Sequence, residues 1–246
     1  MKIKLFLSAA ICLSLSNTTF ANNIDLCTTK FNAGLYTEAV PYCEKACNLN
    51  NGAGCDVLGF LYYEGRGVIQ DYQQAKIYSE KACNLNVGEG CSSLGVLYNK
   101  GQGVKQNYQQ AKTYYEKACN LNVSVGCGLL GGLFYEGQGV RQNYQQAKTY
   151  YEKACNLNDG LSCGHLGVLY AVGKGVKQNY QQAKTYNEKA CNMNVGIGCF
   201  GLGVLYSFGG GVRQNKRTAK EYFGKTCDLG HQQGCDEYRR LNEQGY

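Results

Sequence analysis

The stretch KQNYQQAKTYYEKACNLN at residues 105–122 returns almost unchanged at 141–158 and 177–194. Its cysteine belongs to a series with a spacing of 36 residues: Cys47, Cys83, Cys119, Cys155, Cys191 and Cys227. A second series has the same spacing and follows the first by eight residues: Cys55, Cys91, Cys127, Cys163, Cys199 and Cys235. A period in the mid-thirties is typical of solenoids built from helix pairs. The sequence therefore predicts an all-α protein, an α/α solenoid of 36-residue helix-pair repeats.

The repeated stretch is expected to form the second helix of each pair. Asn107 is a favourable N-cap residue, because its side-chain oxygen can accept a hydrogen bond from a free backbone N–H. Ala111, Tyr114, Tyr115 and Ala118 follow at i, i+3, i+4 and i+7, so they form one apolar stripe. Small alanines and large tyrosines on this stripe suit an interdigitating contact between helices.

The first helix of each pair is expected to begin at the second cysteine of a pair, as in CSSLGVLYNKG at residues 91–101. Leu94 and Leu97 have helical spacing within this stretch. Gly101 and Gly103 predict its C-terminal end, because glycine readily adopts the backbone conformation that terminates a helix. The seven residues between paired cysteines are then expected to form a short turn.

The repeat spacing also predicts the organisation of the chain. Residues 55–234 hold five full repeats, preceded by a shortened helix pair at 22–54 and followed by a single polar helix at 235–246. Polar, atypical ends suit a solenoid, because they shield its terminal faces. Pro41 is expected in the first turn of its helix, where a missing N–H is tolerated.

Residues 1–21 match the three-part pattern of a secretory signal peptide. Lys2 and Lys4 precede an apolar run that is too short to be a permanent membrane span, and Ala21 ends a cleavage signal. We therefore expect a secreted or periplasmic protein without a membrane span. Cleavage would lower the formal charge from +7 to +5, spread over helices, so the lysines are interpreted as solvated and nucleic-acid binding is not expected.

The cysteine count is interpreted as a disulfide framework. Of the 15 cysteines, only Cys12 falls in the expected signal peptide, and exported chains fold where thiols are oxidised. Cysteines at the end of one helix and the start of the next can approach closely enough for a bridge. Cys27 and Cys43 are expected to form a further bridge, with a reactive thiol as the alternative. The spacing does not favour zinc, and no metal site or cofactor is expected.

The unit LGVLYNKGQGVKQNYQQAKTYYEKAC at 94–119 resembles the Sel-one-like repeat, a relative of the tetratricopeptide repeat. With Cys-x₇-Cys at every joint, the chain is similar to the Helicobacter cysteine-rich protein family. This resemblance implies a right-handed superhelix with a concave groove. It also implies penicillin binding, weak β-lactam hydrolysis and recognition by a host. It transfers no catalytic residue.

An enzymatic function finds little support in the residues themselves. No Ser-x-x-Lys motif of an acyl-enzyme β-lactamase occurs, and two histidines, His165 and His231, cannot supply a zinc enzyme. His165 is interpreted as a surface residue rather than a base. Hydrolysis would need another arrangement, such as Glu64 or Glu136 activating water. A β-lactamase therefore remains the alternative to a binding protein.

The binding hypothesis follows from a comparison of the repeats with one another. Second helices are nearly identical, whereas first helices vary between their shared Leu, Gly and Tyr positions. In solenoids of this type first helices line the concave face, so the variable residues are the expected groove, with neutral drift as the alternative. The candidates are Asp56, Phe60, Tyr63, Glu64, Ser93, Val96, Asn99, Lys100, Leu129, Tyr135, Glu136, His165, Val168, Phe200, Val204 and Phe208. We expect a monomer that binds a peptide, a peptidoglycan fragment or a β-lactam, with host or envelope proteins as further partners.

Overall fold

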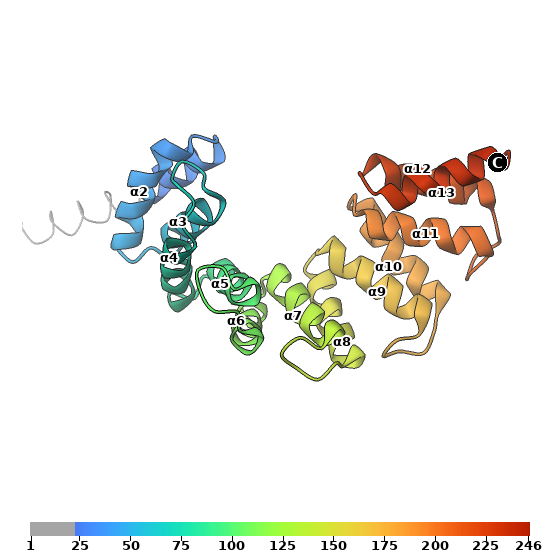
Figure 1. The fold of residues 1–246 in the computed structure, drawn as a ribbon, viewed down its shortest axis with the longest axis horizontal. Coiled ribbons are helices and arrows are strands. Elements are labelled where there is room, and N and C mark those ends of the chain that lie inside the picture. Colours follow the sequence, from blue (N-terminus) through green and yellow to red (C-terminus); the bar gives the residue numbers. More distant parts are fainter. Residues whose placement is uncertain (1–22) are drawn as a thin grey trace, which may run out of the picture. The chain divides into compact units, whose positions relative to one another are not determined.

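The computed structural model describes residues 23–246, so the expected signal peptide at 1–21 lies outside the described residues. Helices and their connections account for the whole described range, which contains no strand. The chain divides into two compact units, one ending at Leu121 and the other beginning at Asn122 (Figure 1). The all-α repeat architecture predicted from the sequence is confirmed. Superhelical handedness and the concave groove remain predictions.

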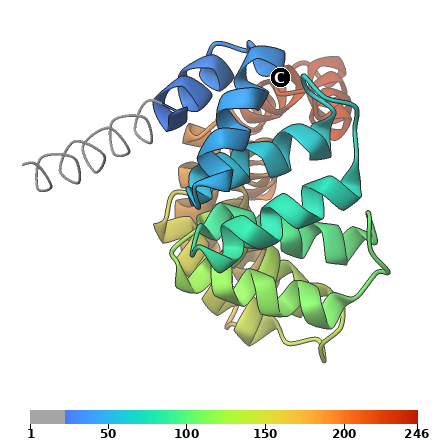
Figure 2. The same cartoon turned by 90° about the vertical axis from the view of Figure 1, so that its left-hand side faces the viewer.

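The first unit is a stack of helix pairs in which consecutive helices pack against one another (Figure 2). After a helical segment at 23–32, its helices are α2 (Tyr36–Asn48), α3 (Gly52–Glu64), α4 (Tyr72–Asn84), α5 (Gly88–Lys100) and α6 (Tyr108–Asn120). Here α3 and α5 are first helices of their repeats, and α4 and α6 are second helices. First helices also contact each other, since α3 packs on α5.

The second unit continues the same pattern. Its helices are α7 (Ser124–Glu136), α8 (Tyr144–Asn156), α9 (Gly160–Val172), α10 (Tyr180–Asn192), α11 (Gly196–Phe208), α12 (Lys216–Asp228) and α13 (Gln232–Glu243). The first helices α9 and α11 contact each other directly, with α10 packed against both. None of the helices in the described part of the chain combines the length and the apolar character needed to cross a membrane.

Helix starts differ from the sequence-based expectation at the cysteine joints. The first helix α5 begins at Gly88, before Cys91, so only residues 85–87 separate it from α4. Asn86 adopts a left-handed conformation there, with φ 60°, and asparagine tolerates this conformation better than most residues. Both cysteines of a joint therefore lie inside helices, rather than flanking a seven-residue turn.

The glycines after each first helix act as predicted. Gly101 caps α5 in the left-handed conformation with φ 70°. Gly103 is also left-handed, and a Cβ atom there would lie 2.5 Å from the Tyr72 carbonyl oxygen. This second glycine lets the loop lie directly on the start of α4.

The second helices also confirm their predicted stripe. Asn107 caps α6 by accepting hydrogen bonds from the backbone N–H groups of Gln109 and Gln110. Ala111, Tyr115 and Ala118 are buried on its inner face. Pro41, by contrast, lies inside α2 rather than in its first turn, because α2 already begins at Tyr36.

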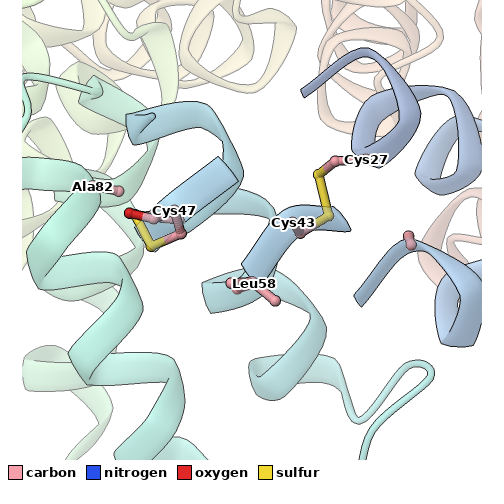
Figure 3. Packing of buried hydrophobic residues seen from close by; sticks show 7 residues of the cluster. Cys27, Cys43, Cys47, Leu58 and Ala82 are labelled. Carbon is pink, nitrogen blue, oxygen red and sulfur yellow. A yellow bond between two sulfur atoms is a disulfide. The ribbon is translucent and has the colours of Figure 1, made fainter. Parts of the chain in front are cut away.

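Disulfides staple the joints of both units. Bonds join Cys47 to Cys55, Cys83 to Cys91, Cys155 to Cys163, Cys191 to Cys199 and Cys227 to Cys235, with Cα atoms 4.5–4.9 Å apart. Cys119 and Cys127 are disulfide-bonded as well. The predicted further bridge is confirmed: Cys27 pairs with Cys43, beside buried Leu58 (Figure 3). The reactive-thiol alternative for this pair is wrong.

Candidate functional site

An apolar pocket of about 310 Å³ opens on the second unit between the first helices α9 and α11. Val168 and Val172 line it from α9, and Phe200, Val204 and Phe208 line it from α11. Four of these five residues belong to the predicted groove, and Val172 adds a fifth side chain of the same kind. The structure thus brings together one coherent subset of the candidates.

The spacing of the residues on α11 explains why this wall is apolar. Phe200, Val204 and Phe208 are four residues apart and share one face of the helix. Leu202 belongs to the core, and Leu205, which reaches the inner end of the pocket lining, is almost fully buried as well. The face of α11 that carries Phe200, Val204 and Phe208 does not pack into the core, so its side chains stay accessible. Val204 is 38% exposed and Phe208 is 50% exposed.

The pocket is closed at its base by Asn187 of α10, which sequence comparison did not single out. Asn187 is only 2% exposed, and its side-chain oxygen Oδ1 has no hydrogen-bond partner. Positions 36 residues before and after it hold large rings, Tyr151 and Phe223. The amide is therefore a short polar replacement for a ring that other repeats bury.

Comparison with the preceding repeat shows how the space arises. There, Tyr151 of α8 stacks on His165 of α9, with ring centroids 5.0 Å apart. The equivalent of His165 in the next first helix is Gly201, which also lines the pocket. The stacked rings of Tyr151 and His165 thus correspond to Asn187 and Gly201 in the next repeat. The pocket lies between α9 and α11, where this repeat has no rings at these two positions.

His165 is more enclosed than its interpretation as a surface residue suggested. It is half-buried against Tyr151, and burial lowers the pKa of its imidazole, while the charges of Asp159 and Glu136 oppose this effect. A half-buried ring that stacks on Tyr151 is a packing residue. The other histidine, His231, lies at the start of α13, so the two imidazoles stand on different elements.

In the first unit, several candidates contact other side chains. The Tyr63 hydroxyl donates to the Gln102 side chain at 3.0 Å and accepts from Lys100 Nζ at 2.9 Å. Phe60 packs edge-on against Phe31, with ring centroids 5.5 Å apart. These contacts give Tyr63, Lys100 and Phe60 clear packing roles.

Asp56 of α3 carries the most strongly displaced carboxyl among the candidates. It is half-buried, and this burial, followed by the charge of Glu89, raises its pKa to about 6. Displaced pKa values often mark functional sites, although packing can cause them too. Asp56 and Glu89 are two carboxylates without a third metal-ligating side chain, and residues 23–246 contain no group of three that could hold a metal ion.

The remaining candidates are scattered over the first helices. Tyr135 packs edge-on against Tyr144, with ring centroids 5.3 Å apart, and Lys174 lies over both rings. Glu64 and Glu136 are exposed at the ends of α3 and α7. The half-buried members are Ser93, Val96 and Asn99 of α5 and Leu129 of α7.

One signal in the sequence could have revealed the base of the pocket. The motif TYYEKAC at 113–119 and 149–155 becomes TYNEKAC at 185–191. The sequence-based prediction placed the ligand-facing residues in the first helices, so it did not include this exchange of Tyr for Asn in a second helix. Tyr180, which also lines the pocket, lies in the second helix α10 and was missed for the same reason. Ile197 was missed because the first helix was expected to begin at Cys199, whereas α11 begins at Gly196.

The helix pairs and their bridged joints define a disulfide-rich α-helical repeat protein. The Sel1 repeat model matches residues 53–87, 88–123, 124–159, 161–195 and 196–231, so the chain belongs to the Sel1 repeat family. It is related to the Helicobacter pylori cysteine-rich proteins. It is 39% identical over 67 residues to HcpD, a candidate beta-lactamase by its name, but this match spans 27% of the chain and 22% of HcpD.

Solved structures extend these comparisons. A Sel1 repeat protein from Oxalobacter formigenes is 25% identical, with 90% of this chain and 98% of that chain covered and a TM-score of 0.81. The protective antigen c5321 of uropathogenic Escherichia coli, which has an SLR fold, is 29% identical with a TM-score of 0.77. The match covers 85% of this chain and 45% of c5321, so this chain spans less than half of that protein. Helicobacter pylori cysteine-rich protein B is 42% identical over 52% of this chain and 92% of its own, with a TM-score of 0.44.

The bridges also indicate where the chain folds. Disulfides persist in oxidising compartments and are rare in the reducing cytosol. The many bridges of this chain therefore indicate an oxidising location outside the cytoplasm.

Proposed function

We propose that this chain is a peptide-binding protein that works outside the cytoplasm and holds its ligand on the face formed by α9 and α11. The observation that supports this is the apolar pocket between the two helices, with exposed Val204 and Phe208 at its mouth. A well-formed apolar pocket is the usual form of a binding site for an apolar group. A peptide also supplies backbone polar groups for the surrounding surface.

The size and chemistry of the pocket favour a peptide over a sugar. Its walls are valine and phenylalanine side chains, which favour an apolar group and offer little to the hydroxyls of a glycan. In a peptidoglycan fragment, the peptide stem would therefore be the part that binds. A penicillin would be a mimic of such a stem.

Binding by the oxidised protein to an array of short peptides tests the proposal, with peptidoglycan fragments and penicillins as further arms. Val204→Asp places a charge at the mouth of the pocket and is expected to abolish peptide binding. The matched control is Val125→Asp on α7, because Val125 is 54% exposed and does not line the pocket. Peptide binding that survives Val204→Asp unchanged would overturn this assignment of the binding face.

β-Lactam hydrolysis is the second candidate, and the match to HcpD is the observation that favours it. Glu64 and Glu136, the carboxylates suggested for water activation, are exposed on different helices. Nitrocefin turnover by the purified oxidised protein, lost in Glu64→Gln or Glu136→Gln, would support hydrolysis. Turnover no faster than that of the reduced, unfolded chain excludes it.

Export in secreted or periplasmic form is the localisation part of the proposal. It predicts a mature N-terminus at Asn22, after Ala21, which N-terminal sequencing of the exported protein measures. A protein that retains Met1 in the cytoplasmic fraction would contradict export.

A further inference from the structure

We infer that the second unit binds an extended anionic polysaccharide along the loops that precede its second helices α8, α10 and α12. These loops, residues 137–143, 173–179 and 209–215, are called the basic edge here, because each carries one cation at the same position: Arg141, Lys177 and Arg213. The edge is separate from the proposed peptide site. Its polar cavities share no lining residue with the apolar pocket between α9 and α11.

The excess positive charge of the chain is concentrated in the second unit. Residues 122–246 contain five more basic than acidic residues, whereas residues 23–121 contain equal numbers of both. Several helix lysines of this unit have internal partners: Lys148 and Lys184 pair with glutamates, and Lys189 donates to a backbone carbonyl. The cations of the basic edge are different. All three are exposed, none forms an ion pair with another described residue, and no acidic residue occurs in the three loops.

The three loops form a continuous edge. A Cβ atom on Gly175 would lie 2.6 Å from the backbone carbonyl carbon of Tyr144, so the second loop lies on the start of α8, directly after the first loop. A Cβ atom on Gly211 would lie 2.9 Å from that of Tyr180, so the third loop lies on the start of α10 in the same way (Figure 1). A row of uncompensated cations attracts a partner that carries several negative charges in succession.

A polar cavity of about 750 Å³ opens at the middle loop of the edge. Lys177 lines it together with Tyr170 and Tyr186, whose rings stack with centroids 5.6 Å apart. Gln145 and Gln182 complete this lining, and their exposed side-chain amides make no hydrogen bond within the described residues. A glutamine amide both donates and accepts, as the hydroxyls of a sugar do, and a tyrosine ring offers a flat apolar face to the C–H groups of a pyranose.

The same kind of cavity recurs at the third loop. It has a volume of about 550 Å³, and Tyr206 and Arg213 line it at the positions that Tyr170 and Lys177 occupy one repeat earlier. A recurring cavity with one cation, one tyrosine and several amides suits a polymer that repeats a charged and hydroxylated unit. Because Tyr170 and Tyr186 already stack on each other, no nucleobase can enter between them, which disfavours a single-stranded nucleic acid.

Isothermal titration calorimetry with oligogalacturonates of two and eight sugars, at about 0.1 M salt, tests the inference. We expect the octamer to bind at least about tenfold more tightly than the dimer, because one long chain contacts several loops at once. Malto-octaose, which has the same length and no charge, is expected not to bind. Failure of the octamer to bind, or equal affinity of octamer and dimer, would overturn the inference.

Other polyanions of the same charge test the choice of polysaccharide. Octaglutamate and an eight-nucleotide oligodeoxycytidylate are expected to bind about tenfold more weakly than the octagalacturonate, because neither presents sugar hydroxyls at the spacing of its charges. Octaglutamate that binds as tightly would indicate an acidic peptide as the partner. DNA that binds as tightly would indicate attraction of any polyanion. Either result overturns the assignment to a polysaccharide.

A double substitution, Lys177→Gln/Arg213→Gln, tests the place of binding. We expect it to lower the affinity for the octamer at least about tenfold and to leave the Tm unchanged, since both side chains are exposed and unpaired. Arg239→Gln/Arg240→Gln is the matched control, because it removes the same charge from α13, where both arginines pair with acidic residues of their own helix. Equal losses in the two variants would show that net charge, rather than the basic edge, determines binding.

Val204→Asp distinguishes this inference from the proposed function. We expect this variant to lose peptide binding and to keep its affinity for the octagalacturonate, because Val204 lines the apolar pocket and neither polar cavity. Loss of octamer binding in Val204→Asp would place the polysaccharide on the peptide face and overturn the basic edge as its site.

Discussion

Lys117 Nζ donates a hydrogen bond to the carbonyl oxygen of Cys83 at 2.7 Å, so α6 is tied to the C-terminal end of α4. Lys189 and Lys225 repeat this contact with the cysteine carbonyls 34 residues before them, at 2.7 and 3.2 Å. Carbonyl groups at a helix C-terminus lack intrahelical partners and carry partial negative charge, which favours a cation. These lysines were predicted to be merely solvated, and for the three that make this contact the prediction is wrong.

Replacing Lys117 by methionine is expected to lower the free energy of unfolding by about 1 kcal/mol, because a charge-assisted hydrogen bond to a half-buried carbonyl is lost. Chemical denaturation measures this change. Lys112→Met is the matched control on the same helix: Lys112 pairs with Glu116 on the outer face, and a pair of this kind contributes about 0.3–0.5 kcal/mol. Equal losses in the two variants would show that the link to Cys83 adds nothing.

Gly103→Ala is expected to lower the free energy of unfolding by more than about 2 kcal/mol, because a left-handed alanine is strained and its Cβ would also meet the Tyr72 carbonyl. Gly34→Ala separates the two effects. Gly34 is left-handed as well, with φ 74°, but a Cβ there meets nothing within 4 Å, so only about 1–2 kcal/mol of strain is expected. Thermal or chemical unfolding of both variants tests whether the loop approaches α4 as closely as described.

Removal of one joint bridge in a Cys83→Ala/Cys91→Ala variant is expected to destabilise the protein by about 2–3 kcal/mol, through loss of a short closed loop. Cys27→Ala/Cys43→Ala opens a loop with a sequence separation of 16 rather than 8, so its loss is expected to be larger by about 0.6 kcal/mol. Unfolding under oxidising conditions measures both. A variant as stable as the parent would contradict a structural role for that bridge.

Asp56→Asn is expected to stabilise the protein above pH 6 by about 1–2 kcal/mol and to have little effect near pH 4. The pKa of Asp56 rises from its ordinary 3.8 to about 6 in the folded state. The native state therefore binds more protons between these values, so the contribution of Asp56 to the free energy of unfolding falls as the pH rises through this window.

The difference between parent and variant across pH 4–7 isolates this effect from other titrating groups. Glu89→Gln removes the second cause of the shift, so it should weaken the pH dependence without abolishing it. Parallel stability curves for parent and Asp56→Asn would contradict the assignment.

The sequence was sufficient to predict the helix pairs, their caps and the cysteine partners. Each of these depends on local rules that repeat every 36 residues: Asn107 caps a helix because of its own side chain, and Gly101 ends one because of its own backbone freedom. Helix starts were misplaced at the joints because Gly88 gives no clear N-terminal signal and Val87 makes no side-chain cap. Pro41 was misplaced because Leu35, the N-cap residue of α2, provides no capping side chain either.

The sequence by itself determined the repeat, its helices and its bridges, because the residues that cause them lie within one repeat and recur in the next. Only the tertiary structure decided which variable residues meet. Val168 and Phe208 share a pocket because α9 and α11 pack side by side, and Tyr63 and Lys100 share a hydrogen bond instead. The importance of Asn187 likewise became visible only when its neighbours in space, Gly167 and Gly201, were known, since a missing ring opens a pocket only where no other side chain fills the gap.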